Sequence, residues 1–388
     1  MKILLTIHEK FLPDSGSAGS TFRLGQEYER LGHDVSFFSL NEMPKLQRQV
    51  KRFVFPEFVA AHVAKLSQTN GLDVVDGSPG DNWLCGIKHH LLPGKHPLLV
   101  TRSHGLQHLE NRWAIEEAGQ GRLELSWFYH LYRGGYLLWE ITNSFRWADL
   151  AFFLNQAEVD YACQHLGVHP SNAHVFPNGM PESFIGLPFQ PLSHSDNTTI
   201  RIAQIGTYIQ RKGIEYSVPA LKKILKRYPN VEVSFVGTGF MASEDPQQVV
   251  YKDFDPIFHP RIKVIPQYHH DMLPSLLKDH HINIFPSLSE GFGKALIEAM
   301  SCGLASVVSD ADGPMEIVKD NHDALVVPRR NAAAIETAID ILIRDRNLLE
   351  KIRCNAYDTA QRYSWKAIAA SRLAAYDKAL QAKTSIER

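Results

Sequence analysis

The chain has 388 residues, which is too long for one ordinary hydrophobic core, so two domains are expected. Its formal net charge is −1, so no overall field favours nucleic acid, and any anion site must be local. Four widely spaced cysteines without a C-x-x-C pair argue against a disulfide scaffold and a cysteine zinc site. No apolar run approaches the length of a membrane span or a signal peptide, so we expect a cytoplasmic protein.

The first segment predicts a strand, a glycine-containing loop, a helix and a second strand. Residues 2–7 form the first strand, residues 8–19 the loop and residues 35–40 the second strand. The helix between them has an apolar face that includes Leu31, and Gly32 ends it. This order is typical of a βαβ opening with a parallel sheet, but G-x-G-x-x-G is absent, so a nicotinamide site is not supported.

Two further strands are predicted at residues 72–76 and 98–102. The second runs into Ser103-His104-Gly105, and open α/β sheets hold ligand groups at the carboxyl ends of their strands. His104 is therefore a candidate site residue. The alternative is a surface or structural histidine, since the chain has 19 of them.

Residues 122–147 are unusually aromatic, with rings at helical spacing. We expect a helix that packs on the first domain. The alternative is a surface that contacts an acceptor or the inner face of a membrane, because aromatics beside arginines suit interfaces. A strand at 150–154 follows, and the proline-containing segment 181–197 is interpreted as a linker.

The second half repeats this order of elements. A strand precedes the loop Gly206 to Gly213, which leads into a helix, and a later strand ends at Gly237-Thr238-Gly239. The strands are predicted at residues 200–205, 231–236, 262–265 and 282–285. The 364–382 segment is predicted as a helix with Leu373, Tyr376 and Leu380 on one face.

The stretch 286–303 carries the strongest signal. A buried strand stops at a proline, a glycine loop with Gly291 and Gly293 follows, and a helix is expected from about Gly293 to Cys302. Helix N-termini attract anions, so Glu290 and Glu298 could face one ligand whose anionic part rests on the loop amides. Alternatively, Glu290 caps the helix, and Lys294 forms a solvated ion pair with Glu298.

Two histidine pairs, His269-His270 and His280-His281, invite a metal interpretation. Adjacent residues of one element point apart and no carboxylate motif accompanies them, so we expect surface histidines and no metal site.

The 286–303 stretch resembles the E-x7-E signature of retaining glycosyltransferases of family 4, the group 1 glycosyltransferases. Pro286-Ser287, Glu290-Gly-Phe-Gly293 and Glu298-Ala-Met-x-x-Gly303 all match. Gly206 and Lys212 match a second motif, but Thr207 stands where arginine is usual, and Arg211 is a candidate replacement. The resemblance implies the GT-B fold, an α/β fold of two Rossmann-like parallel-sheet domains that face each other across a cleft.

The linker and the predicted final helix set the domain limits, and the resemblance implies the role of each part. We expect an N-terminal acceptor-side domain at 1–180, a nucleotide-sugar-binding domain at 181–364, and a helix at 365–388 that crosses back to the first domain.

By resemblance, the chain moves a sugar from a nucleotide diphosphate sugar, with UDP or GDP as the favoured nucleotide, to a hydroxyl acceptor, with retention and without metal or cofactor. The resemblance assigns catalytic roles to His104, Lys212 and Glu290. It assigns donor binding to Gly16, Ser17, Gly206, Arg211, Lys212, Gly239, Glu290, Gly291, Phe292, Gly293, Lys294 and Glu298.

Three alternatives share the fold. A nucleotide-sugar epimerase would act on donor without an acceptor, and a silent scaffold would bind nucleotide without turnover. A phosphorylase would need a pyridoxal lysine, for which Lys294 lacks supporting context.

Overall fold

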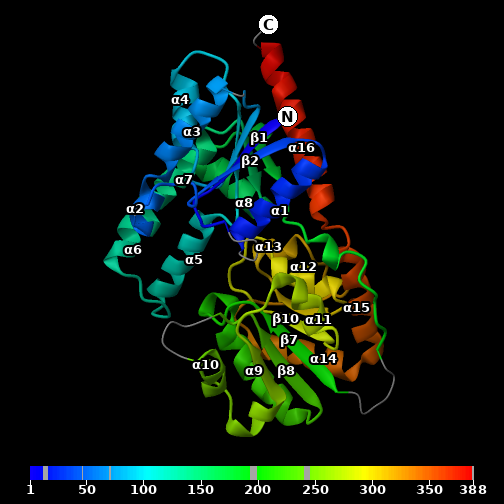
Figure 1. Ribbon diagram of the computed structural model, residues 1–388. Coiled ribbons are helices and arrows are strands. Elements are labelled where there is room, and N and C mark those ends of the chain that lie inside the picture. The colour runs from blue at the N-terminus through cyan, green and yellow to red at the C-terminus, as the bar shows by residue number, and fades with distance from the viewer. Residues whose placement is uncertain (12–15, 46, 70, 193–198, 240–244, 387–388) are drawn as a thin grey trace. The chain divides into compact units, whose positions relative to one another are not determined.

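The computed structural model describes residues 1–11, 16–45, 47–69, 71–192, 199–239 and 245–386. The chain divides into two compact units, which we call unit 1 and unit 2 (Figure 1). Unit 1 comprises Met1–Gly179 together with Trp365–Arg388, and unit 2 comprises Met180–Ser364. No helix within the described ranges is long and apolar enough to cross a bilayer.

Unit 1 is built on a six-stranded parallel sheet in the order β2-β1-β3-β4-β5-β6. The chain first moves outward from β1 to β2 and then continues on the other side of β1, so the strand order reverses between β1 and β3. The strands are β1 (Lys2–Ile7), β2 (Asp34–Ser39), β3 (Val74–Gly77), β4 (Leu98–Arg102), β5 (Leu150–Phe153) and β6 (Ala173–Val175).

The helices of unit 1 cover both faces of this sheet. They are α1 (Ser17–Arg30), α2 (Arg48–Phe53), α3 (Phe55–Thr69), α4 (Trp83–Leu91), α5 (Gln107–Gly119), α6 (Trp127–Leu131), α7 (Leu137–Arg146), α8 (Gln156–Tyr161) and α16 (Trp365–Ile386), with π-helical turns η1 (Tyr132–Tyr136) and η2 (Ala162–Leu166) and the 3₁₀ turn η3 (Pro170–Asn172). Successive strand residues point to opposite faces. Ile3 and Leu5 therefore pack with α1 and α16, whereas Leu4 packs with α3.

Helix α16 is part of the core of unit 1. Figure 1 shows it, in red, beside α1. Trp365, Leu373 and Tyr376 are buried against the sheet, and Leu380 is half-buried on the same face, as the sequence predicts. Burial of such side chains contributes about 1.5–3 kcal/mol each.

A buried polar network ties α16 to the strands. The Arg102 guanidinium donates to the Asp76 carboxylate at 2.6 Å, and the Tyr376 hydroxyl donates to the other Asp76 oxygen at 2.5 Å. The Tyr28 and Tyr376 hydroxyls lie 3.0 Å apart. Burial and the Asp76 charge raise the pKa of Tyr376, so this hydroxyl stays protonated and remains a donor.

Unit 2 has a second six-stranded parallel sheet, in the order β12-β11-β10-β7-β8-β9, which reverses between β7 and β10. Helices α9 and α14 share one core with the sheet, and α12 and α15 contact β11. The strands are β7 (Ile200–Ile205), β8 (Val231–Val236), β9 (Ile262–Ile265), β10 (Ile282–Phe285), β11 (Ala305–Ser309) and β12 (Ala324–Val327). The helices are α9 (Ile214–Arg227), α10 (Pro246–Lys252), α11 (Leu273–Leu277), α12 (Lys294–Ser301), α13 (Asp312–Met315), α14 (Ala332–Arg344) and α15 (Arg346–Ala360), with 3₁₀ turns η4 (Glu182–Phe184), η5 (Gln210–Lys212), η6 (Pro256–Arg261) and η7 (His270–Met272).

The predicted α/β class with two parallel sheets is confirmed, and two local predictions are wrong. Leu31, expected on the buried face of α1, lies beyond the helix and is 38% exposed. The 181–197 segment is not a plain linker, because Phe184 in η4 is fully buried and its ring packs 5.1 Å from that of His270. Residues 193–198 of this segment lie outside the described ranges.

Candidate functional site

The strand order of unit 2 brings the loops after β7 and β10 together at the carboxyl edge of the sheet. The Leu288 amide donates to the Arg211 carbonyl at 2.9 Å and joins the two loops. Gly213 has a φ of +74°, and a Cβ at this position would lie 2.0 Å from the Pro286 carbonyl oxygen. Only glycine therefore permits this close approach.

Three charged side chains converge where these loops meet. The Lys212 ammonium forms an ion pair with the Glu290 carboxylate, and one guanidinium nitrogen of Arg211 lies 3.9 Å from the same oxygen. Arg211 also donates to the Ser289 carbonyl at 2.9 Å, and Lys212 lies 5.4 Å from the centre of the Phe285 ring. Two cations thus share one carboxylate at a half-open site, with Lys212 and Glu290 each 17% exposed.

The alternative that Glu290 caps α12 is wrong. The N-cap position of α12 is Gly293, and no side chain accepts a hydrogen bond there. Glu290 is held from α13 instead, because the Gly313 amide donates to its carbonyl at 3.2 Å. A Cβ on Gly313 would lie 2.5 Å from that carbonyl oxygen, so this contact also requires glycine.

Glu298 lies one helical turn further along α12 and is buried, with 3% exposure. Its carboxylate is 2.7 Å from Nε2 of His270 in η7, which follows β9. The alternative of a solvated ion pair between Lys294 and Glu298 is therefore wrong. Burial and the Glu298 charge also raise the pKa of the Tyr268 hydroxyl nearby.

The surface placement expected for the histidine pairs is also wrong at two positions. His270 is 8% exposed and His280 is 7% exposed, and Nε2 of His280 bonds the Ser234 hydroxyl at 2.9 Å. His269 is exposed, as expected. In the part of the chain that the structure describes, no three His, Cys, Asp or Glu residues form a group that could hold a metal ion.

Two of the predicted backbone groups are already used inside the protein. The Gly206 amide donates to the Val236 carbonyl at 2.8 Å, and the Gly239 amide donates to the Pro266 carbonyl at 3.1 Å. The side chains of Arg211 and Lys212 and the start of α12, which begins at Lys294, lie at the same edge.

In unit 1, the predicted residues lie at the carboxyl edge of the first sheet. Gly16 is the exposed N-cap residue of α1, and the Ser17 hydroxyl donates to Glu9 at 2.8 Å. Residues 12–15 of the predicted glycine loop lie outside the described ranges.

His104 follows β4 and bonds the Ser78 hydroxyl at 2.9 Å through Nε2. Ser78 donates its single proton to the Thr6 carbonyl at 3.0 Å, so Nε2 of His104 is the donor and Nδ1 is the unprotonated nitrogen. Burial, followed by the charges of Arg102, His8 and Arg372, lowers the pKa of His104 well below its usual value. The ring is therefore neutral near pH 7.

Sequence reasoning missed a second polar cluster in unit 1. Nδ1 of His8 lies 2.6 Å from the Asp81 carboxylate; burial lowers the pKa of His8, but the charge and hydrogen bond of Asp81 outweigh burial and raise it. Beside them, burial raises the pKa of Glu140 to about 7, and Trp83 donates to this carboxyl at 3.3 Å. The rule that ligand groups lie at the carboxyl ends of strands could have identified His8, which directly follows the end of β1.

Comparison with solved structures defines the class of protein. Sucrose-phosphate synthase from Thermosynechococcus elongatus superposes with a TM-score of 0.78 at 18% identity and covers 98% of this chain and 99% of its own. HepE from Anabaena, in complex with UDP, gives a TM-score of 0.71 at 18% identity and covers 97% of this chain and all of its own. These likenesses show the fold alone, which is GT-B with two Rossmann-like units.

Sequence comparison then gives the family. The sequence model "Glycosyltransferase Family 4" matches residues 15–184, and the model "Glycosyl transferases group 1" matches residues 190–359. A glycosyltransferase from Methanocaldococcus jannaschii is 32% identical over 187 residues, which cover 46% of this chain and 44% of that protein. The chain spans about half the length of the curated relatives it matches. The protein belongs to the group 1 glycosyltransferases, which confirms the predicted family.

Proposed function

We propose that this chain is a hexosyltransferase that moves a sugar from a nucleotide diphosphate sugar to a hydroxyl acceptor, with retention of configuration and without a metal ion. The observation that carries the proposal is the pairing of Arg211 and Lys212 with Glu290 where the sheet of unit 2 reverses. Open α/β sheets hold their ligands at such reversal points. Family membership supports the same reaction.

The charges at this site suit the departure of a diphosphate. As the bond from the anomeric carbon to the phosphate oxygen breaks, negative charge grows on the leaving group, and Lys212 with Arg211 would stabilise it. Glu290, released from its pairing with Lys212, would accept hydrogen bonds from the donor-sugar hydroxyls. In this front-face displacement, the acceptor oxygen bonds to the anomeric carbon, and the leaving phosphate oxygen takes the acceptor proton.

Glu298 suits the nucleotide part of the donor. Its carboxylate is buried and oriented by His270, and a carboxylate beside a sheet edge commonly grips a ribose diol. Gly291, Phe292, Gly293 and Lys294 connect it to Glu290, so we assign the whole segment to the donor. UDP is favoured as the nucleotide by the fold likeness to HepE, which was solved with UDP and with UDP-glucose; GDP is the other candidate.

In unit 1, we propose from the family motifs that Gly16 and Ser17 bind the donor and that His104 acts in catalysis. The neutral imidazole of His104 offers an unprotonated Nδ1, which can accept a hydrogen bond from a sugar hydroxyl. The hypothesis is that His104→Ala lowers turnover far more than it weakens binding of bare nucleotide diphosphate. Equal losses in both measurements would assign His104 a structural role.

The decisive experiment is a panel of nucleotide diphosphates assayed by melting temperature. A nucleotide that binds only the folded protein adds about 2.7 kcal/mol of stability at a concentration of 100 Kd. We expect UDP or GDP to raise the melting temperature and the matching sugar donor to be consumed only when an acceptor extract is added, with EDTA present. No stabilisation by any nucleotide would contradict the proposal, and donor consumption without acceptor would favour an epimerase.

We also propose that the acceptor side of the enzyme contacts the inner membrane face through α6 and α7. Trp127, Phe128, Leu131 and Trp139 are 73%, 59%, 62% and 48% exposed, and aromatic side chains of this kind settle at bilayer interfaces. Sedimentation with lipid vesicles tests the contact. Trp127→Ser should release the protein from vesicles, whereas Ile257→Ser, which removes an equally exposed apolar side chain in unit 2, should not.

A further inference from the structure

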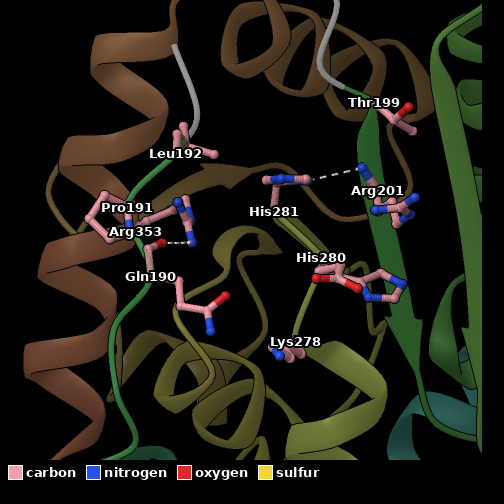
Figure 2. A pocket seen from close by; sticks show the side chains of 10 residues that line it. Gln190, Pro191, Leu192, Thr199, Arg201, Lys278, His280, His281 and Arg353 are labelled. Atoms are coloured by element: carbon pink, nitrogen blue, oxygen red, sulfur yellow. Dashed lines mark hydrogen bonds between the residues drawn. The ribbon is translucent and has the colours of Figure 1, made fainter. Parts of the chain in front are cut away.

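Unit 2 contains a pocket at the opposite edge of its sheet from Lys212 and Glu290. It is lined where β7 and β10 begin, by Thr199 and Arg201 on one side and by residues 278–281 on the other (Figure 2). Arg353 of α15 and the 190–192 segment complete the wall. The pocket has a volume of about 330 Å³, which falls in the range of pockets that hold small-molecule ligands.

The walls of this pocket present hydrogen-bond donors. Nδ1 of His281 accepts from the Arg201 backbone amide at 3.1 Å, as Figure 2 shows, so the neutral ring carries its proton on Nε2 and donates there. The Arg201 guanidinium pairs with Glu232, to which its Nε donates at 2.8 Å, and within the described ranges no hydrogen bond engages its two terminal nitrogens. The exposed ammonium of Lys278 likewise has no partner among the described residues.

Cationic side chains outnumber carboxylates on the lining of the pocket, although Arg201 is paired with Glu232 and Arg353 with Glu350 behind it. Its lining residues include Arg201, Lys278 and Arg353 but a single carboxylate, that of Asp279. Burial, followed by the charges of Arg353, His280, Arg346 and Arg201, lowers the pKa of His281 to about 4. The His281 ring is therefore neutral near pH 7, with its single ring proton on Nε2, where it can donate to a ligand.

The wall formed by Arg353 is held in place by hydrogen bonds within the protein. Arg353 is 4% exposed and donates to the carbonyls of Gly303 and Gln190 at 2.6 and 2.9 Å and to Glu350 at 2.8 Å. It therefore contributes charge and shape, while Arg201 and Lys278 remain able to turn toward a ligand. A rigid cationic wall opposite two adaptable cations is a suitable cradle for a compact anion.

We propose that this pocket binds a small phosphate monoester, such as a sugar phosphate, independently of the donor site. The phosphate group would accept hydrogen bonds from Lys278, Arg201 and Nε2 of His281. The remaining volume and the polar side chains of Thr199 and Gln190 would accommodate the hydroxyls of the attached group.

Calorimetry with glucose 6-phosphate and with inorganic phosphate tests this proposal. Lys212→Ala, which removes the cation proposed to hold the donor diphosphate, should leave glucose 6-phosphate binding unchanged. Lys278→Gln should weaken it about tenfold, which corresponds to the loss of one charge-assisted hydrogen bond. Inorganic phosphate should bind more weakly than the ester but with the same dependence on Lys278.

The control is Lys226→Gln, which removes an exposed lysine of α9 that does not line the pocket. Lys278 is exposed, so its variant should keep the wild-type melting temperature and the comparison is not confounded by unfolding. Absence of saturable binding by either anion would overturn the proposal. So would binding that Lys278→Gln leaves unchanged or that Lys212→Ala abolishes.

Discussion

Each unit has a six-stranded parallel sheet whose strand order reverses once, but the two units treat the polar groups at the carboxyl edge of the sheet in opposite ways. In unit 1, Arg102 and Asp76 are 2% and 0% exposed; both terminal nitrogens of Arg102 and both carboxylate oxygens of Asp76 have partners within the protein, and only Nε of Arg102 has none among the described residues. In unit 2, Lys212 and Glu290 are each 17% exposed and share one contact. The first arrangement is a closed network, whereas the second can exchange its partners for a ligand.

This difference shows how one fold serves two purposes. A buried charge pair loses several kcal/mol if one partner is removed, so its residues are committed to stability. A partly exposed pair is worth little to stability and therefore can be broken at low cost when a ligand arrives. We infer that unit 1 holds α16 in place with its network, and that unit 2 keeps its charges for the donor.

The largest effect on turnover should come from the partly exposed ion pair of Lys212 and Glu290. Lys212→Ala should lower turnover about 100- to 1,000-fold, or roughly 3–4 kcal/mol, because a donor to the growing charge is lost. It should also weaken nucleotide diphosphate binding, and initial rates and calorimetry measure the two losses. The melting temperature should stay within the range of the Lys226→Ala control. A melting temperature of Lys212→Ala far below that of the control would contradict the contrast between the two units, because Lys212 would then contribute to stability.

Substitutions in the buried network of Arg102, Asp76 and Tyr376 should lower the free energy of unfolding. Tyr376→Phe removes a buried hydroxyl that donates to Asp76, and hydrogen bonds to charged groups contribute about 1.5–3 kcal/mol. Denaturant unfolding should show this loss. Tyr357→Phe, which removes a hydroxyl bonded to the neutral Leu187 carbonyl in unit 2, should cost less. An equal loss of unfolding free energy in both variants would show that the hydrogen bond to Asp76 contributes no more to stability than one to a neutral carbonyl.

Substitutions at the two carboxylates of unit 2, Glu290 and Glu298, should have different effects on ligand binding. Glu298→Gln should weaken bare nucleotide about tenfold, roughly 1.4 kcal/mol, through the ribose. Glu290→Gln should keep that affinity within about twofold, because it frees Lys212 for the diphosphate, while discrimination between donor sugars is lost. Calorimetry with nucleotide and rates with two donors measure both. If Glu290→Gln loses nucleotide affinity as severely as Glu298→Gln, the assignment of sugar and ribose is wrong.

A further effect concerns pH and the second polar cluster of unit 1, which contains His8, Asp81 and Glu140. The folded-state pKa of Glu140 is raised from 4.5 to about 7, chiefly by burial. Its contribution to stability is therefore fully present below about pH 4.5 and is lost as pH rises through about 7. Glu140→Gln removes this dependence, so the melting temperature of wild type should fall relative to the variant between those two values. Parallel curves would show that the carboxyl titrates normally.

Much of the fold could be predicted because strands in this protein are short apolar runs with clear ends. The bounds of β4, β8, β9 and β10 agree with the sequence prediction to the residue. The closeness of Lys212 and Glu290 follows from the same reasoning, since each lies in the loop after a parallel strand and those loops meet at one edge.

Contacts between distant residues could not be predicted in the same way. His270 and Glu298 are 28 residues apart, and Tyr376 and Asp76 are 300 apart, so no local pattern indicates either pair. The sequence predicts a surface position for His270, because adjacent residues of one element point apart and no carboxylate motif accompanies the pair. Its burial depends on Phe184 and α12, which only the folded chain brings together. The cationic pocket beside Arg201 has the same origin.

The membership of α16 in unit 1 has a consequence for the order in which the protein is made. Residues 180–364 emerge from the ribosome between the two segments that form unit 1. Unit 2 can therefore complete its fold during translation, while the nascent unit 1 waits with Asp76 and Tyr28 deprived of the Tyr376 hydroxyl. The apolar sheet face that α16 later covers stays open for that interval, which makes this face a natural place for a chaperone to engage the growing chain.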